Sequence, residues 1–398
     1  MSSLVLKNCR LVSALVEGYE GEYADVCIRD GKISEIRPLG YDFGDTPSMD
    51  AANQTLLPGL IDLHMHLMFV NQDYPAMLQR TPYEYLLDCL DAAKIFLRQG
   101  YTTIRDCGCE KGLNAAVRDA VNAGRVPGPR IITSGHCVTP TERGNSCFGA
   151  LYKVFDKPED AMRVVREERE LGADWIKLMA TGSVMNVGGE PGALIITPDE
   201  IKALCDAAAF YGTYVGAHCH GKRAILECIK AGVKTIEHGS YLDEEVIDAI
   251  LADGNRVAVI GTYAVCYALW RNLDGTVPQE FIDKLDVIMQ SYGKMGIEAS
   301  KAGVHFGWGS DIDQATREKY VGMEFTARAD IGFDNLTMLR QATIESARIL
   351  NMDDRIGSVK EGKLADLILI DGNPDEDISV MTKLPSHVFK GGVEYTNL

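Results

Sequence analysis

Histidine and aspartate side chains follow several apolar stretches of this chain, and their types suit metal binding. His64 and His66 are two residues apart, a spacing at which two side chains on a strand point to the same side. His218, His238 and Asp311 follow three later apolar stretches. Neutral imidazoles and carboxylates are ligands of Zn²⁺ and other first-row divalent metals. If the strands form one barrel, these side chains meet at one mouth, and the sequence predicts a metal site there.

Lys177 lies inside the apolar stretch from Trp175 to Thr181, where an unpaired ammonium group is costly. In one interpretation the side chain reaches solvent or pairs with a carboxylate. In the other, the amine has reacted with CO₂ to form a carbamate, an anion whose two oxygens can bridge two metals. Four histidines and an aspartate can fill one site or be shared between two, and a bridging carbamate favours two metals that share a hydroxide.

Eight apolar segments, separated by helical segments, predict the strands that must position these side chains. They are residues 59–66, 102–107, 130–135, 175–181, 214–220, 235–239, 256–262 and 304–311. Helix signals lie between them: Thr197 is a predicted N-cap, and Gly100 and Gly172 are predicted C-caps. This alternation is typical of an α/β (β/α)8 TIM-type barrel, whose active site lies at the carboxyl ends of the strands.

The two ends of the chain have a different pattern, with short alternating strands and a hairpin signal at Asp30-Gly31. We expect both ends to build one small β-sandwich domain. The predicted division is residues 1–57 plus 357–398 for this composite domain and residues 58–356 for the barrel.

Composition narrows the class of protein. The net charge of -17 and the pI near 4.9 argue against nucleic acid and anionic membrane surfaces as partners. Eleven cysteines without a repeated Cys-x-x-Cys spacing indicate reduced thiols. The start has no signal-peptide pattern, and no apolar stretch approaches the roughly 18 residues of a spanning helix. We therefore expect a cytoplasmic protein.

Four motifs resemble those of the amidohydrolase superfamily, over nearly the whole chain. They are Leu57 to His66, Glu237-His238-Gly239, Gly309-Ser310-Asp311, and the stretch from Ser346 to Asp366. The placement of Lys177 resembles the binuclear-metal branch that includes Xaa-Pro and Xaa-Arg/Lys dipeptidases. Imidazolonepropionase-related members usually use one metal.

The resemblance implies two divalent metals, expected to be Zn²⁺, and a ligand set. His64, His66 and Asp311 would hold the first metal, His218 and His238 the second, and carbamylated Lys177 would bridge both. A metal-bridging hydroxide would attack the scissile carbonyl, which the second metal polarises. Asp311 would act as base and then as acid. Relatives often form homo-oligomers, so the resemblance also implies a homo-oligomer.

The expected substrate is a small amide or dipeptide, with Xaa-Pro, Xaa-Arg/Lys and N-acyl amino acids as leading cases. A cyclic amide or lactone hydrolase, or a deaminase of the imidazolonepropionase-like type, is the alternative. A phosphoester side activity would also suit two metals. A non-catalytic scaffold on the same fold is disfavoured, because every ligand position is filled.

Five further residues are candidates for substrate binding: His136, His220, Tyr241, Tyr263 and Arg271. Two of them, His136 and His220, lie where dipeptidases of this branch carry other residues that help to bind a substrate carboxylate. Asp62 shares a strand face with His64, and we expect it to orient an imidazole. Gly188-Gly189 predicts a mobile loop over the site.

Overall fold

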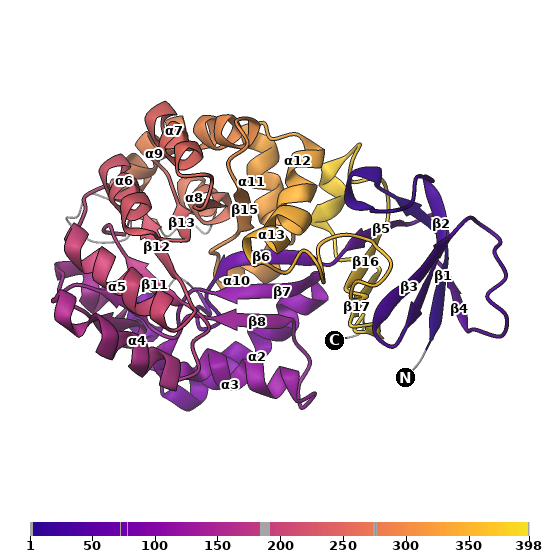
Figure 1. The fold of residues 1–398 in the computed structure, drawn as a ribbon, viewed down its shortest axis with the longest axis horizontal. Helices are drawn as coiled ribbons and strands as arrows, with labels where there is room; N and C mark the ends of the chain where they lie inside the picture. Colours follow the sequence, from indigo (N-terminus) through magenta and orange to yellow (C-terminus); the bar gives the residue numbers. More distant parts are fainter. Residues whose placement is uncertain are drawn as a thin grey trace.

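The computed structural model describes residues 3–71, 73–77, 79–183, 192–273, 275, 277–396 and 398. A barrel of strands and helices occupies one side of the molecule, and a smaller sheet drawn from both chain ends occupies the other (Figure 1). In that figure the indigo strands of the N-terminal end and the yellow strands of the C-terminal end lie together. The α/β fold class expected from the sequence is confirmed.

All eight predicted barrel strands form, and their neighbours pair in parallel. They are β6 (Leu60–Met65), β7 (Tyr101–Asp106), β8 (Arg130–Thr133), β11 (Ile176–Met179), β12 (Val215–Cys219), β13 (Thr235–His238), β14 (Ala258–Thr262) and β15 (Phe306–Gly309). Two short strands that the sequence did not predict, β9 (Cys137–Thr139) and β10 (Tyr152–Val154), extend the sheet beyond β11. Almost every strand residue is buried, as expected for a parallel sheet that is covered on both faces.

Hydrogen bonds close the barrel where the parallel ladders stop. The backbone N–H of Asp311 donates to His64 O at 2.9 Å, which joins the end of β15 to β6. Asp174 N donates to Thr133 O at 2.7 Å, which joins the start of β11 to β8. The first closure places Asp311 directly beside the histidine strand.

Helices cover the outside of the barrel. The longer ones are α2 (Pro82–Arg98), α3 (Leu113–Asn122), α4 (Ala161–Glu170), α5 (Pro198–Phe210), α6 (Lys222–Ala231), α7 (Glu244–Ala252), α8 (Tyr263–Trp270), α9 (Gln279–Lys301) and α11 (Met323–Ile331). Shorter ones are α1 (Tyr74–Met77), α10 (Gln314–Lys319), α12 (Asn335–Arg340) and α13 (Ser346–Ile349). Thr197 caps α5 in a capping box with Glu200, as the sequence predicted.

The second sheet has eight strands, five from the front of the chain and three from its end. They are β1 (Leu4–Leu11), β2 (Tyr23–Arg29), β3 (Lys32–Arg37), β4 (Ser48–Asp50), β5 (Thr55–Pro58), β16 (Leu367–Ile370), β17 (His387–Lys390) and β18 (Val393–Glu394). Asp30 and Gly31 both have positive φ and form the predicted hairpin turn between β2 and β3. A backbone hydrogen bond of 2.9 Å from Ile33 N to Lys363 O joins β3 to the segment that precedes β16. The sheet therefore closes around its own hydrophobic core. We propose the division at residues 57 and 357 on this basis.

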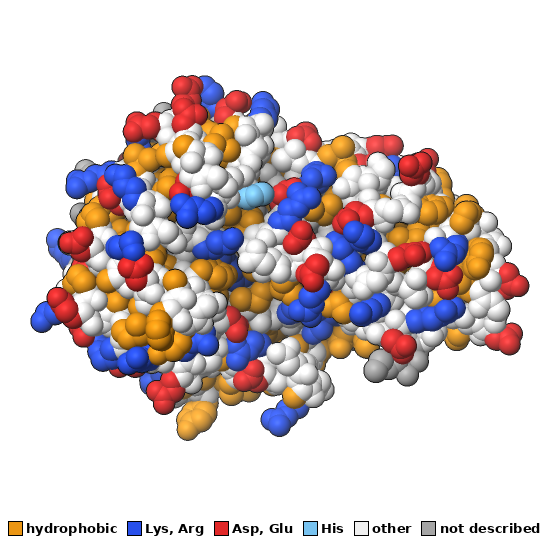
Figure 2. Space-filling view, in the orientation of Figure 1, with side chains coloured by type: hydrophobic (Ala, Val, Ile, Leu, Met, Phe, Trp, Pro, Cys, Tyr) orange, Lys and Arg blue, Asp and Glu red, His pale blue; other side chains and the backbone are white. Residues whose placement is uncertain are grey.

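The two parts share a continuous path of chain. β5 lies in the middle of the second sheet, and Gly59 leads from it directly into β6 of the barrel. A Cβ on Gly59 would lie 2.2 Å from Thr102 Oγ1, so only glycine fits at this junction. Acidic and basic side chains are interspersed over the face shown in Figure 2. Within the described residues, no helix combines the length and apolar character needed to cross a membrane.

Candidate metal centre

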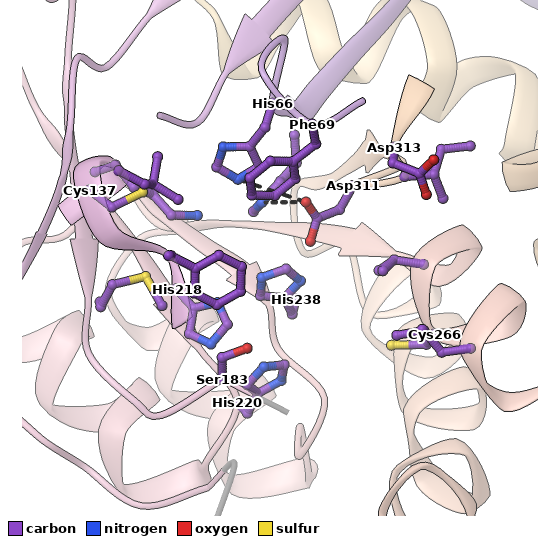
Figure 3. Close-up of a pocket in the computed structure, with 18 of the residues that line it drawn as sticks. His66, Phe69, Cys137, Ser183, His218, His220, His238, Cys266, Asp311 and Asp313 are labelled. Atoms are coloured by element: carbon purple, nitrogen blue, oxygen red, sulfur yellow. Dashed lines mark ion pairs between the residues drawn. The ribbon is translucent and has the colours of Figure 1, made fainter. Parts of the chain in front are cut away.

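One cavity at the carboxyl-end mouth of the barrel collects all six predicted metal ligands. Its volume is about 110 Å³. The ligand side chains lining it are His64, His66, Lys177, His218, His238 and Asp311. Figure 3 shows Asp311 reaching toward His66 from one side, with His218 and His238 across the cavity. The convergence follows from the parallel barrel, in which every strand ends at the same mouth.

The donor atoms lie close enough to share cations. Asp311 Oδ1 is 3.6 Å from His64 Nε2 and 3.8 Å from His66 Nε2. Potential ligand atoms of His64, His238 and Asp311 lie within 4.8 Å of one another, and so do those of His218, His220 and His238. The second group adds His220, which the sequence suggested as a substrate contact, to the possible ligands.

Four of the imidazoles are held through Nδ1, and this leaves Nε2 for the cavity. Such outer contacts orient histidine ligands and fix their tautomers. The contacts are His64 Nδ1 to Glu237 Oε2 at 2.8 Å, His66 Nδ1 to Gly108 O at 3.0 Å, His220 Nδ1 to Ser240 Oγ at 2.8 Å, and His238 Nδ1 to Thr262 Oγ1 at 2.7 Å.

The buried imidazoles are neutral, as metal ligands must be. Burial lowers the pKa of His66 and of His220 to about 3 and that of His64 well below its usual value, and the charge of Lys177 adds to each effect. The pKa values of His218 and His238 are also lowered, first by burial. Burial raises the pKa of Asp311 to about 7.

Lys177 lies on β11 and is 2% exposed. No hydrogen bond or salt bridge joins Lys177 directly to another described side chain, but its charge acts on the Asp311 carboxylate in the same cavity, where it opposes the burial that raises the pKa of that group. Asp311 is therefore the carboxylate with which the ammonium form would interact. A buried amine between neutral imidazoles is an unfavourable place for a lone cation. The donor set fits metal binding, because neutral imidazoles, one carboxylate and an amine able to form a carbamate face one cavity.

A buried network stands behind His64. Arg105 Nη2 donates to both oxygens of Glu237 at 2.7 and 2.8 Å, and Thr235 donates its hydroxyl to the same carboxylate at 2.5 Å. The guanidinium stacks over Trp175 at 4.4 Å. Arg105 and Glu237 are both fully buried. Glu237 therefore holds His64 while its own charge is balanced.

Asp62 has a different role from the expected one. Its carboxylate accepts hydrogen bonds from the Ser310 hydroxyl at 2.5 Å, from Arg317 at 3.0 Å and from the backbone N–H of His64 at 3.1 Å. It contacts no imidazole, because Glu237 takes that place. Instead it anchors the turn before Asp311, whose φ of 54° lies in the strained left-handed region.

The other substrate-contact candidates lie away from the cavity. His136 Nδ1 lies 3.0 Å from Glu168 Oε2, and His136 Nε2 accepts from Lys111 N. Tyr263 is fully buried against Tyr292. Arg271 is exposed and stacks over Trp270 at 4.4 Å.

Tyr241 follows β13 and is half-buried, and the described cavity lining does not include it. His220 is the one candidate of the five that faces the cavity. The predicted loop at 188–189 lies outside the described residues.

Sequence reasoning missed most of the apolar lining. Phe69, Phe148, Leu151 and Tyr152 form one side, and Val265, Cys266, Leu269, Leu285 and Ile312 contribute to the rest. Phe69 and Ile312 follow predicted strand ends closely and could have been suspected from that position. Phe148 and Leu151 lie in or beside short 3₁₀ turns that have no periodic signal.

The barrel and its histidine-lined mouth define the class of protein: a (β/α)8 hydrolase equipped to bind metal. The model of the Amidohydrolase family matches residues 55–394, and the chain belongs to this family. It is accordingly a hydrolase that acts on carbon–nitrogen bonds.

Individual relatives agree with this. The chain is 31% identical over 367 residues to an ochratoxinase of Aspergillus niger, an alignment that covers 85% of this chain and 75% of that one. The crystal structure of a prolidase complexed with N-methylphosphonate-L-proline is 30% identical, with a TM-score of 0.87 and 99% of each chain covered. A Xaa-Pro dipeptidase with bound methionine is 27% identical, with a TM-score of 0.88, and 99% of this chain and 100% of that one are covered.

Proposed function

We propose that this protein hydrolyses the amide bond of a small substrate with the help of two divalent metals, expected to be Zn²⁺. The observation that carries the proposal is the position of Lys177, which is buried among neutral imidazoles and forms no direct salt bridge with a described carboxylate. As a carbamate, it would present two anionic oxygens to the cavity where an ammonium would repel cations. His64, His66 and Asp311 would hold one metal, and His218 and His238 the other.

The metals, when bound, supply Lewis-acid chemistry and acidify water near neutral pH. The side chains orient this chemistry. Nδ1 contacts such as that of His64 with Glu237 keep Nε2 directed at the cavity. Asp311 accepts the proton of the attacking water and passes it to the departing nitrogen. A bound cation favours its carboxylate form, which the base step needs.

The leading substrates are N-acyl amino acids and dipeptides of the Xaa-Pro or Xaa-Arg/Lys kind. Similarity to a prolidase and to a Xaa-Pro dipeptidase supports this class. A panel of dipeptides, N-acyl amino acids and cyclic amides, assayed by turnover, tests it. Turnover of cyclic amides alone would favour the alternative, a cyclic amide hydrolase.

Metal analysis of the purified protein tests the binuclear centre. We expect two metals per wild-type chain in the presence of bicarbonate, and at most one in Lys177→Ala, which has lost the bridging group. Lys222→Ala is a matched control, because Lys222 pairs with Asp243 and Glu245 on the surface. One metal or fewer in the wild type, with no change in Lys177→Ala, would contradict two metals.

A further inference from the structure

The cavity has an aromatic wall beside His66, formed by Phe69, Phe148 and Tyr152. The Phe69 ring stacks on the His66 ring, with centroids 4.5 Å apart. Phe69 and Phe148 are 6.1 Å apart with an interplanar angle of 26°, and Phe148 meets Tyr152 edge to face at 5.7 Å. Rings at these separations are in direct contact, so no further ring fits between them. A substrate would lie along the wall.

The wall begins at the reacting centre. His66 is a candidate metal ligand, and Figure 3 shows the Phe69 ring beside its imidazole and close to Asp311. Phe148, in the segment between β9 and β10, and Tyr152, the first residue of β10, continue away from it. A group attached to the scissile amide therefore meets this wall first.

Four aliphatic side chains line another part of the cavity, and the described lining carries little positive charge. Val265, Leu269, Leu285 and Ile312 line the same cavity from α8, α9 and the turn after β15. In the described lining Lys177 is the sole lysine or arginine, whereas Asp311 and Asp313 are acidic.

Two side chains of a type that binds carboxylates, His136 and Arg271, are engaged elsewhere. His136 is held by the Glu168 carboxylate. Arg271 stacks over Trp270 and Tyr267 outside the cavity. A substrate carboxylate thus finds no guanidinium in the described lining.

We infer that the preferred substrates carry an aryl group next to the scissile amide, packed on the aromatic wall, and that a free carboxylate contributes little to their recognition. This inference rests on the proposed amide hydrolysis. We therefore expect aryl amides to be better substrates than aliphatic dipeptides, whose recognition would depend on a charged terminus.

A matched substrate series tests it on the metal-loaded enzyme. N-benzoyl-L-alanine and N-acetyl-L-phenylalanine are compared with N-acetyl-L-alanine, and each acid with its primary amide. We expect at least one aryl compound to have a kcat/KM roughly tenfold or more above that of the acetyl-alanine reference, given the size of aromatic packing energies. Replacing the acid by the amide should change kcat/KM by less than about threefold.

A variant pair links the preference to the wall. Phe148→Leu removes one ring and should reduce the aryl-to-alkyl ratio of kcat/KM severalfold. Phe210→Leu is the matched control, because Phe210 is 72% exposed at the end of α5 and outside the cavity; it should leave the ratio unchanged. A ratio that stays the same in Phe148→Leu would overturn the assignment of the wall.

Binding separates failure of this inference from failure of the proposed function. Benzamide and propanamide are titrated into the metal-loaded enzyme and followed by ligand-observed NMR. Tighter binding of benzamide, weakened in Phe148→Leu, supports the aryl site even if no amide is turned over, and in that case the proposed hydrolysis is wrong. Equal binding of the two amides, or loss of turnover when the carboxylate is removed, overturns the inference while amide hydrolysis stands.

Discussion

At the scale of single residues, the carboxylate behind His64 matters as much as the ligands that face the cavity. Glu237 receives two hydrogen bonds from Arg105 and one from Thr235, and its second oxygen contacts His64 Nδ1. All four side chains are buried. The network balances the charges of Arg105 and Glu237 and fixes the His64 imidazole. A metal could therefore bind to this imidazole without rearrangement of its neighbours.

Glu237→Gln should weaken metal binding about 10- to 100-fold, the range found when an outer partner of a ligand is changed. The neutral amide leaves the buried Arg105 guanidinium without a counter-charge, and its NH₂ group places a donor against either Arg105 or His64. Competition with a chromophoric chelator measures the affinity. Thr235→Val, which removes one hydroxyl and keeps the carboxylate, is the control and should have the smaller effect. Unchanged affinity in Glu237→Gln would show that the contact does not orient the ligand.

A second buried carboxylate, that of Glu324, makes the stability of the fold depend on pH. Glu324 accepts from Arg328 Nε at 2.7 Å and from Ala264 N at 2.6 Å, yet burial raises its pKa from 4.5 to about 7. The folded protein thus binds this proton more tightly than the unfolded chain does. The stability that it contributes is complete below about pH 4.5 and is lost as the pH rises through about 7.

Thermal unfolding of wild type and Glu324→Gln at pH 5 and pH 8 measures this. The wild type should lose stability relative to Glu324→Gln on going to pH 8, by on the order of 3 kcal/mol at most. Glutamine does not titrate, so all other groups cancel in the comparison. A constant difference between the two proteins across this pH range would mean that Glu324 is already ionised at pH 5.

At the scale of elements, the contact between β15 and β6 sets the distance from Asp311 to the histidines. Gly309 ends β15, and a Cβ there would lie 2.7 Å from the Cβ of His64 and 2.9 Å from Cγ2 of Ile260. The two strands approach this closely because glycine has no side chain. The backbone bond from Asp311 N to His64 O depends on the same approach.

Gly309→Ala should force β15 and β6 apart and destabilise the fold by about 1–3 kcal/mol, as overpacking does. It should also lower metal content, because Asp311 moves with the strand. Gly192→Ala is the control, since its nearest neighbour would be at an ordinary 3.5 Å. Full metal content together with an unchanged unfolding temperature would rule out a tight β15–β6 contact.

Much of this element arrangement could be predicted from the sequence. The eight strands have continuous apolar runs, and ligands such as His218 and Asp311 follow those runs directly. The wall residues Phe148 and Tyr152 could not be found, because one lies between short 3₁₀ turns and the other begins a three-residue strand, and only the tertiary fold brings them to the cavity. Asp62 and Glu237 illustrate the same limit: both are acidic strand residues, and distant partners decide which one reaches an imidazole.

At the scale of the whole molecule, one buried aspartate joins the two parts. Asp366 accepts from Arg130 Nη1 at 2.8 Å and from Gly391 N at 2.7 Å, and its backbone oxygen accepts from Gly59 N. These partners belong to the barrel, to the C-terminal strands and to the junction between the two parts. The two parts should therefore unfold together.

Asp366→Ala should lower the unfolding temperature and leave a single transition, because the Arg130 guanidinium and Gly391 N lose an acceptor at a cost of roughly 1–3 kcal/mol each. Calorimetry measures this, and metal content should not change. Asp371→Ala, which removes an exposed carboxylate hydrogen-bonded to Gln54, is the control. Two separate transitions in the wild type would contradict the coupling.

The central position of β5 also bears on how the chain reaches its folded state during synthesis. Thr55 pairs with Ile370, and the entire barrel lies between them in the chain. On the ribosome, the N-terminal strands leave one edge of β5 without its neighbour until β16 has emerged. An edge exposed for so long invites pairing with other chains. We therefore expect chaperones to bind mainly to nascent chains whose barrel has been synthesised but whose last strands have not.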